Sequence, residues 1–217
     1  MRNPGMGIFL ALLLSAGTVV ASATTINFSS LSGGAPDPSL TGAVLVGASY
    51  TQAGFTFTSG GSKFDVWQAS SPNLPSLNPA DTSLFEFYAY VATTLTDGGN
   101  PFTLSSIDLA PVIAGGTGTF TVTFTGTHPD LTTVVQTFTV NDSPSALQSF
   151  AFSGFTNLVS VAYDQGTNSG YFANQDTAYQ FDNVVVSASS VPEPGTLLML
   201  GSGVLAAAGA FRRKFNV

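Results

Sequence analysis

Thr119-Phe-Thr-Val-Thr-Phe-Thr125 is the stretch that predicts the fold most clearly. In it Phe120, Val122 and Phe124 alternate with threonines. Successive side chains of a β-strand point to opposite faces of the sheet, so this alternation predicts one face in a hydrophobic core and the other in water. A strand of this kind needs other strands on either side of it, and the rest of the chain offers them.

Residues 24–190, the body of the chain, contain further short runs of strand-like composition and no helical periodicity. These runs cover residues 25–29, 43–46, 54–58, 63–68, 84–94, 103–109, 132–140, 148–152, 158–163 and 178–187. Turn-forming Gly, Pro, Asn, Asp and Ser lie between them, as in residues 33–38, 97–101 and 164–168. The pattern predicts an all-β body, a single antiparallel β-sandwich that is jelly-roll-like, with the 18 Phe residues filling its two inward faces.

The charges are divided unevenly along the chain. Of the five cations, Arg2, Arg212, Arg213 and Lys214 lie near the two ends, which leaves Lys63 alone in the middle. Residues 24–191 hold eleven acids against that one lysine, a formal charge of −10. Without a basic surface to neutralise phosphates we expect no nucleic-acid partner. The chain has no Cys, which excludes disulfides and thiolate chemistry.

Residues 1–23 have the three parts of a secretory signal peptide. Arg2 supplies a positive charge, residues 7–16 are apolar, and Ala21 and Ala23 are the small residues expected before a cleavage site. We therefore predict that signal peptidase cuts after Ala23 and leaves Thr24 as the new N-terminus. An N-terminal membrane anchor is the alternative, which the short apolar stretch disfavours.

Residues 191–217 form a second targeting segment, whose composition differs from that of the signal peptide. Val191-Pro-Glu-Pro-Gly195 is followed by a mostly apolar segment, residues 196–211, and by the basic residues 212–217. A helix of this length measures about 24 Å, enough for one transmembrane helix with modest bilayer thinning. The basic cluster predicts that its end stays in the cytoplasm, with the body across the inner membrane.

This order of parts resembles the PEP-CTERM protein-sorting signal, over the last 27 residues of the sequence. The motif residues are Val191, Pro192, Glu193 and Pro194, and the basic cluster is Arg212, Arg213 and Lys214. The resemblance implies that a membrane-embedded exosortase recognises the motif and removes the tail, in Gram-negative bacteria that make exopolysaccharide. Glu193 would then belong to the recognition element. A plain single-span tail anchor stays open as the alternative.

A second resemblance concerns the two ends of the body. Ile26-Asn-Phe28, residues 50–57 and residues 179–186 look like the first and last strands of galactose-binding-like or carbohydrate-binding-module jelly rolls. The resemblance implies that these strands pair and that Asp182 helps to hold a structural calcium. The partner acid expected after the first strand is missing, because serines follow Phe28. We expect no other cofactor.

The sequence offers little for catalysis. Glycoside hydrolysis needs two carboxylates across a cleft, yet Glu86 is the only Glu of the body and no local group of acids accompanies it. The single His, His128, lies in a turn-like segment, and no nucleophile or phosphate-loop motif occurs. We predict that the protein is not an enzyme.

Sugar binding has more support in the sequence. In residues 84–91, period two places Glu86, Tyr88 and Tyr90 on one face and Phe85 on the other. Two rings and a carboxylate can stack on a sugar and bind its hydroxyls, and Trp67 could add a third ring. The alternative is that Tyr88 and Tyr90 belong to the core of the second sheet, with their hydroxyls at its rim, and that Trp67 packs against other side chains.

These observations predict a secreted, exosortase-processed protein of the cell surface or extracellular matrix. Its expected role is structural or interactive, associated with exopolysaccharide or biofilm. A lectin-like carbohydrate-binding module is the alternative, and a glycan-active hydrolase comes third.

Overall fold

The computed structural model describes residues 22–61, 63–67, 82–86, 91–112, 118–141, 146–167, 179–189 and 201–205. The chain divides into one unit of Ala21–Ser189 and another made of Met1–Val20 with Ser190–Val217. Of this second unit, only the helical residues 201–205 are described. The described residues contain no helix long and apolar enough to span a membrane. The predicted span over 196–211 lies mostly outside them and stays a prediction.

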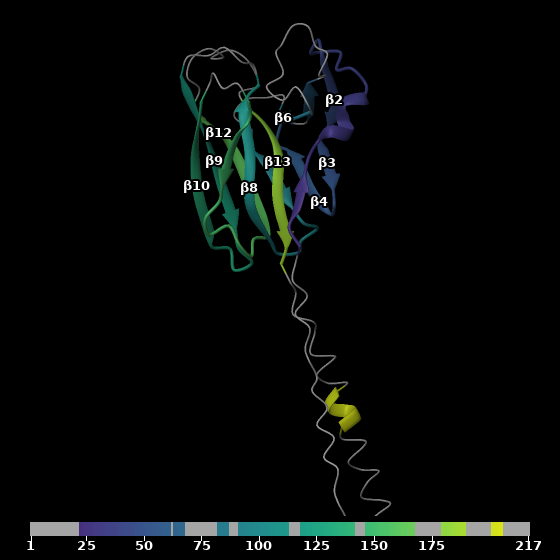
Figure 1. The fold of residues 1–217 in the computed structure, drawn as a ribbon, viewed down its shortest axis with the longest axis vertical. Helices are drawn as coiled ribbons and strands as arrows, with labels where there is room; N and C mark the ends of the chain where they lie inside the picture. The colour runs from purple at the N-terminus through teal and green to yellow at the C-terminus, as the bar shows by residue number, and fades with distance from the viewer. Residues whose placement is uncertain are drawn as a thin grey trace, which may run out of the picture. The chain divides into compact units, whose positions relative to one another are not determined.

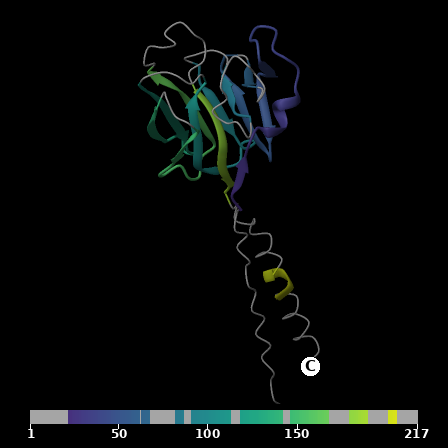
Figure 2. The ribbon, with the colours of Figure 1, turned by 45° about the horizontal axis from the view of Figure 1, so that its top comes forward.

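Two antiparallel sheets form the unit Ala21–Ser189, so the predicted all-β sandwich is confirmed (Figures 1 and 2). The seven-stranded sheet has the order β11 (Gln148–Ala151), β8 (Phe102–Pro111), β13 (Tyr179–Ala188), β6 (Leu84–Glu86), β5 (Phe64–Trp67) and β2 (Ala43–Gly47), with β1 (Thr24–Ile26) also paired with β13. The six-stranded sheet has the order β10 (Thr133–Asn141), β9 (Thr119–Thr127), β12 (Ser160–Thr167), β7 (Thr93–Thr96), β4 (Phe55–Ser59) and β3 (Ser49–Gln52). A short 3-10 helix, η1 (Ser29–Gly33), follows β1.

The chain passes from one sheet to the other where a single strand over residues 84–94 is expected. In the structure β6 ends at Glu86 in the seven-stranded sheet, and β7 begins at Thr93 in the six-stranded sheet. The connection from β4 to β5 crosses in the opposite direction beside it, and the Gly60 N–H donates to the carbonyl of Ala92. The prediction of one continuous strand is therefore wrong, because period two shows which residues share a face but not where a strand changes sheet.

Phenylalanine is the most frequent residue in the described core between the sheets. Phe181 of β13 is fully buried, and its ring lies 5.5 Å from Phe28, 5.7 Å from Phe57 and 5.3 Å from Tyr163. Alternation places the threonines of β9 on the solvent side and Phe120, Val122 and Phe124 in this core, as the opening stretch predicts. Aromatic burial of this extent accounts for much of the sandwich's stability.

Two glutamine side chains close one open side of the sandwich, where β10 and β11 are the edge strands of different sheets. Gln148 accepts from the Asn141 N–H at 3.1 Å and donates to the Asn141 carbonyl at 3.2 Å. Gln136 accepts from the Ser153 N–H at 3.0 Å and donates to the Ala151 carbonyl at 3.2 Å. Each amide thus occupies backbone groups that an exposed edge would offer to another chain.

We expect Gln148→Ala to lower the free energy of unfolding by about 1–2 kcal/mol, because it leaves both backbone groups of Asn141 without this partner. Gln148→Glu should cost a similar amount, since a carboxylate keeps the acceptor and loses the donor. Thr139→Ala, an exposed position on β10, is the matched control with an effect within about 0.5 kcal/mol. Urea denaturation measures all three; equal effects of Gln148→Ala and Thr139→Ala would contradict this role.

Candidate functional site

Glu86 lies between the two sheets and not on an open face. Its side chain belongs to the seven-stranded sheet, yet Ser59 Oγ of β4 donates to one carboxyl oxygen at 2.6 Å and Thr93 Oγ1 of β7 to the other at 3.2 Å. Both donors come from the six-stranded sheet. Because Glu86 is only 4% exposed, the expectation that its carboxylate faces solvent for sugar binding is wrong. It joins the sheets where the chain crosses between them.

Burial raises the pKa of Glu86 to about 7, although hydrogen bonds from Ser59 and Thr93 and the backbone of Gly60 oppose this shift. The pKa of the Tyr163 hydroxyl is also raised well above its ordinary value, first by burial and then by the charges of Tyr179 and Glu86. Chemically, Glu86 can hold or release one proton near neutral pH while it stays buried between the sheets. This arrangement suits a structural carboxyl group.

Trp67 packs on the outer face of the seven-stranded sheet and is 4% exposed. Its ring stacks on Phe85 with centroids 5.0 Å apart, and its Nε1 donates to the carbonyl of Val112 at 3.1 Å. The expectation of an open ring at Trp67 is therefore wrong, and the alternative that this ring packs against other side chains holds. Tyr88 and Tyr90 lie outside the described residues, so their part in sugar binding stays a prediction.

A buried acid pair around Lys63 escapes the sequence analysis. Lys63 Nζ forms an ion pair with Asp37, donates to Ser39 Oγ at 2.7 Å, and lies 3.7 Å from Asp65 Oδ2. Asp65 is fully buried on the outer face of β5, next to Phe85 of β6 in the ladder. The available signal in the sequence is that Lys63 is the only cation of the body.

The two acids of this group have opposite pKa shifts. Burial and the neighbouring Asp37 carboxylate raise the pKa of Asp65 to about 7, and Lys63 opposes them. Burial also acts to raise the pKa of Asp37, but hydrogen bonds from Lys63 and Ser39 outweigh it and hold that pKa well below its ordinary value. Asp37 is therefore ionised more readily than an ordinary aspartate, whereas Asp65 takes up a proton more readily.

Asp182 is fully buried at an irregular point of β13. It lies opposite Asp108 of β8, and its Oδ1 accepts from the Asn183 N–H at 2.8 Å. Asn183 Nδ2 donates to Asp108 Oδ2 at 2.9 Å, while Ser149 donates to the other Asp108 oxygen at 2.5 Å. Asn183 has a φ of +47°, and the ladder register shifts directly after Asp182.

Calcium binding at Asp182 stays a prediction. Calcium prefers six to eight oxygen ligands. Within the ranges that the structure describes, no group of three or more His, Cys, Asp or Glu residues is close enough to hold a metal ion. The paired carboxylates of Asp108 and Asp182 already receive hydrogen bonds from Ser149 and Asn183.

The solvent face of the six-stranded sheet, here called the threonine face, carries many hydroxyl groups. Its threonines are Thr51, Thr56, Thr58, Thr94, Thr96, Thr119, Thr121, Thr123, Thr125, Thr127, Thr133, Thr137 and Thr139. Cross-strand hydroxyl pairs join Thr123 to Thr137 at 3.0 Å and Thr51 to Thr56 at 2.9 Å. Asp164 is the one charged side chain among the described residues of this face. The result is a hydroxyl-rich surface of low charge on a strongly acidic body.

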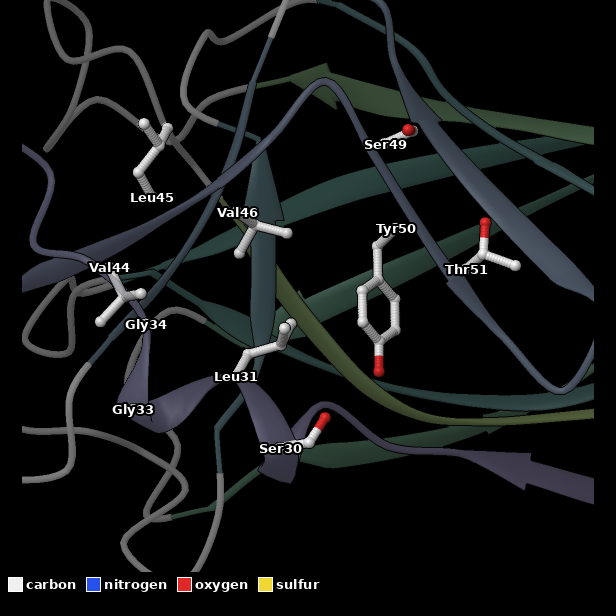
Figure 3. Close-up of a pocket in the computed structure, with 10 residues that line it drawn as sticks. All are labelled: Ser30, Leu31, Gly33, Gly34, Val44, Leu45, Val46, Ser49, Tyr50 and Thr51. Atoms are coloured by element: carbon white, nitrogen blue, oxygen red, sulfur yellow. The ribbon is translucent and has the colours of Figure 1, made fainter.

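A shallow groove of about 420 Å³ lies between the two edge strands β2 and β3, beside η1. Figure 3 shows Leu31, Val46 and Tyr50 side by side along it, whereas Leu45 extends away from them. The Tyr50 hydroxyl donates to Gln52 at 3.0 Å, and its ring contacts Phe28. The groove is mostly apolar and contains none of the predicted site residues.

The predicted processing residues fall at the limits of the described chain. Ala23 is exposed, and Thr24 begins β1. Ala21, residues 191–194 and residues 212–214 lie outside the described residues. Trp67 stacks on Phe85, and Asp182 lies opposite Asp108 in the ladder. Glu86 lies on the opposite face of the seven-stranded sheet from Trp67, so the structure does not bring these two predicted residues together.

Comparison with known families identifies one motif. Residues 190–214 match the family described as the PEP-CTERM protein-sorting motif. The chain carries this motif, and the resemblance drawn from Val191 to Lys214 is confirmed. No curated protein matches the chain.

The solved structures that this chain matches include carbohydrate-binding modules. A mutant of the family 29 module CBM29-2 has a TM-score of 0.34 and 15% identity, covering 77% of this chain and 93% of the module. The CBM22-1 xylan-binding domain of Xyn10C from Paenibacillus barcinonensis has a TM-score of 0.36 and 15% identity, covering 62% and 86%. The MgGH51 α-L-arabinofuranosidase has a TM-score of 0.38 and 9% identity, covering 76% of this chain and 24% of the enzyme. At such TM-scores the likeness carries no argument about function.

Proposed function

We propose that this chain is the precursor of a surface or extracellular-matrix protein of a Gram-negative bacterium. Signal peptidase removes residues 1–23, the C-terminal helix holds the precursor briefly in the inner membrane, and an exosortase removes the tail. The observation that carries the proposal is the match of residues 190–214 to the sorting motif. The sandwich is then the delivered part, which takes its place among exopolysaccharide or biofilm polymers.

The surface of the sandwich supports an interactive role toward neutral polymers. The body has eleven acids and one lysine, so anionic polysaccharides would be repelled over most of it. The threonine face is the exception, since Asp164 is its one charge within the described chain. Hydroxyl groups there can exchange hydrogen bonds with the hydroxyls of a neutral glycan, each weak but many along one polymer.

Within the part of the chain that the structure describes, no site geometry supports a catalytic role. Glu86, the only glutamate of the body, is held by Ser59 and Thr93 between the sheets. We infer a non-catalytic protein, in which this carboxyl group stabilises the crossing of the chain between sheets.

Replacing Pro192, Glu193 and Pro194 together by alanine should keep the protein in the membrane fraction, because an exosortase that reads the motif no longer removes the tail. Immunoblots of membrane, surface and medium fractions test this in exosortase-positive cells. The wild type is expected at the surface or in the medium, and the variant at the membrane. The single substitution Val191→Ser, next to this triplet, is a milder comparison. Identical fractions for the wild type, the triple variant and Val191→Ser would contradict the proposal.

The carbohydrate-binding alternative now depends on Tyr88 and Tyr90, since Trp67 and Glu86 are buried. Pull-down of the secreted body by neutral polysaccharides separates this alternative from the threonine face. If the threonine face makes the contact, replacing Thr121, Thr123 and Thr125 by lysine should weaken retention at least about tenfold, because three ordered side chains project into the interface. Tyr88→Ala/Tyr90→Ala should leave it unchanged. The reverse result would favour a lectin-like module.

A further inference from the structure

The first and last strands of the body pair with each other. In this ladder Thr24 lies opposite Val186, Thr25 opposite Val185 and Ile26 opposite Val184, antiparallel to one another. The start of β1 therefore lies beside the end of β13, and both ends of the body leave the sandwich at the same place. Ser189, the last described residue after β13, donates its N–H to the carbonyl of Pro101 at 2.9 Å.

This pairing uses the residues that directly follow the predicted signal cleavage site. Thr24 is half-buried in the ladder, and Ile26 is fully buried in the main core. Hydrolysis of the Ala23–Thr24 bond adds water, giving a carboxylate on Ala23 and a free amine on Thr24. A peptidase must hold several residues on both sides of that bond in an extended form, free of other partners. A paired Thr24–Ile26 segment is not available to it.

The topology also sets when this pairing can form. Ile26 and Val184 are about 160 residues apart in the chain, so β1 has no partner until nearly the whole body has crossed the membrane. The sorting motif follows β13 within a few residues. The arrival of β13 therefore almost coincides with the arrival of the tail.

We propose that docking of Thr24–Ile26 onto β13 ends the period in which the signal peptide can be removed. Signal peptidase acts while β1 is still unpaired, and a precursor that folds with its signal attached becomes resistant. The inference rests on the proposed secretion of the body but not on the exosortase step. The pairing of β13 with β1 therefore determines when cleavage before Thr24 can no longer occur.

Purified full-length precursor with its signal intact, kept in detergent, allows a direct test with purified signal peptidase. Folded wild type should be cut at least about a hundredfold more slowly than the same chain diluted from urea into the assay just before the enzyme is added. Intact mass identifies Thr24 as the new N-terminus. Cleavage of the folded wild type as fast as the unfolded chain would overturn the proposal, and so would an unfolded chain that is not cut before Thr24.

Two variants show whether the protection is local. Ile26→Ala removes core contacts of β1 and should speed cleavage of the folded precursor roughly tenfold to a hundredfold. Val140→Ala, at a fully buried position on the distant edge strand β10, destabilises the sandwich without freeing β1 and should change the rate much less. Equal acceleration by both variants would show that cleavage needs global unfolding, and would overturn the role of β1 docking. The comparison of folded and unfolded wild type stands even if Ile26→Ala does not fold.

Discussion

The free energy of unfolding should fall by several kcal/mol between about pH 4.5 and pH 8, because two buried acids ionise less readily in the folded protein than in the unfolded chain. The folded pKa values of Asp65 and Glu86 are both about 7, against ordinary values of 3.8 and 4.5. Each acid contributes stability that is fully present below its unfolded pKa and is lost as the pH rises through its folded pKa. At about 1.4 kcal/mol per pKa unit, these shifts correspond to at most about 4 kcal/mol for Asp65 and about 3 kcal/mol for Glu86.

The contribution of Asp37 to the free energy of unfolding changes with pH in the opposite direction. Its folded pKa lies below the ordinary value of 3.8, so its contribution is present above that pH and is lost as the pH falls further. Together the three acids predict a stability maximum near pH 4–5. Urea denaturation at pH 3, 4.5, 6 and 8 measures the profile.

Amide substitutions identify the acids that cause the pH dependence of the free energy of unfolding. Asp65→Asn/Glu86→Gln removes both titrations and should make the free energy of unfolding nearly independent of pH between 4.5 and 8. Thr139→Ala, an exposed substitution that removes no titratable group, should keep the wild-type slope. A flat wild-type profile, or a double variant that keeps the wild-type slope, would contradict the assignment.

Phe181→Ala should lower the free energy of unfolding by about 3–5 kcal/mol, because it opens a cavity at the centre of the core. The ring of Phe181 contacts Phe57 and Tyr163 of the six-stranded sheet, and Phe28 of the segment between β1 and η1. Phe181→Leu should recover part of the loss, because it fills most of the same volume.

Phe150→Ala is the matched control for this truncation. Phe150 is only partly buried, packs on Phe138 near the edge of the sandwich, and should cost less than half as much. Urea denaturation at pH 5 gives the comparison. A loss at Phe181 no larger than that at Phe150 would show that the core is not organised around the rings of β13.

Local patterns in the sequence predict the sandwich and the sorting motif well. The alternation in residues 119–125 is found in β9, which extends to Thr127, and the motif is a linear signal that needs no folding to be read. The hairpin of β3 and β4 shows a limit of the pattern: Ser49–Gln52 forms a strand that composition alone did not predict. Its turn depends on Ala53 and Gly54, both with positive φ.

The polar interior could not be predicted, because its partners are far apart in the chain. Period two assigns Glu86 a face, but only the fold brings Ser59 and Thr93 of the other sheet to its carboxyl group. Lys63 and Asp37 meet in the same way across 26 residues. The local sequence around a buried acid does not differ from that around an exposed one. The sequence therefore predicts a sugar-facing carboxylate at Glu86, whereas in the structure this carboxyl group accepts hydrogen bonds from the other sheet.

The intact mass of the protein recovered from matched cells with and without the exosortase shows directly whether both ends of the precursor are removed. Exosortase-positive cells are expected to yield a body that begins at Thr24 and lacks Arg212, Arg213 and Lys214, whereas exosortase-negative cells should yield the same body with its tail. A mature protein that still carries Arg212–Lys214 in exosortase-positive cells would contradict this expectation.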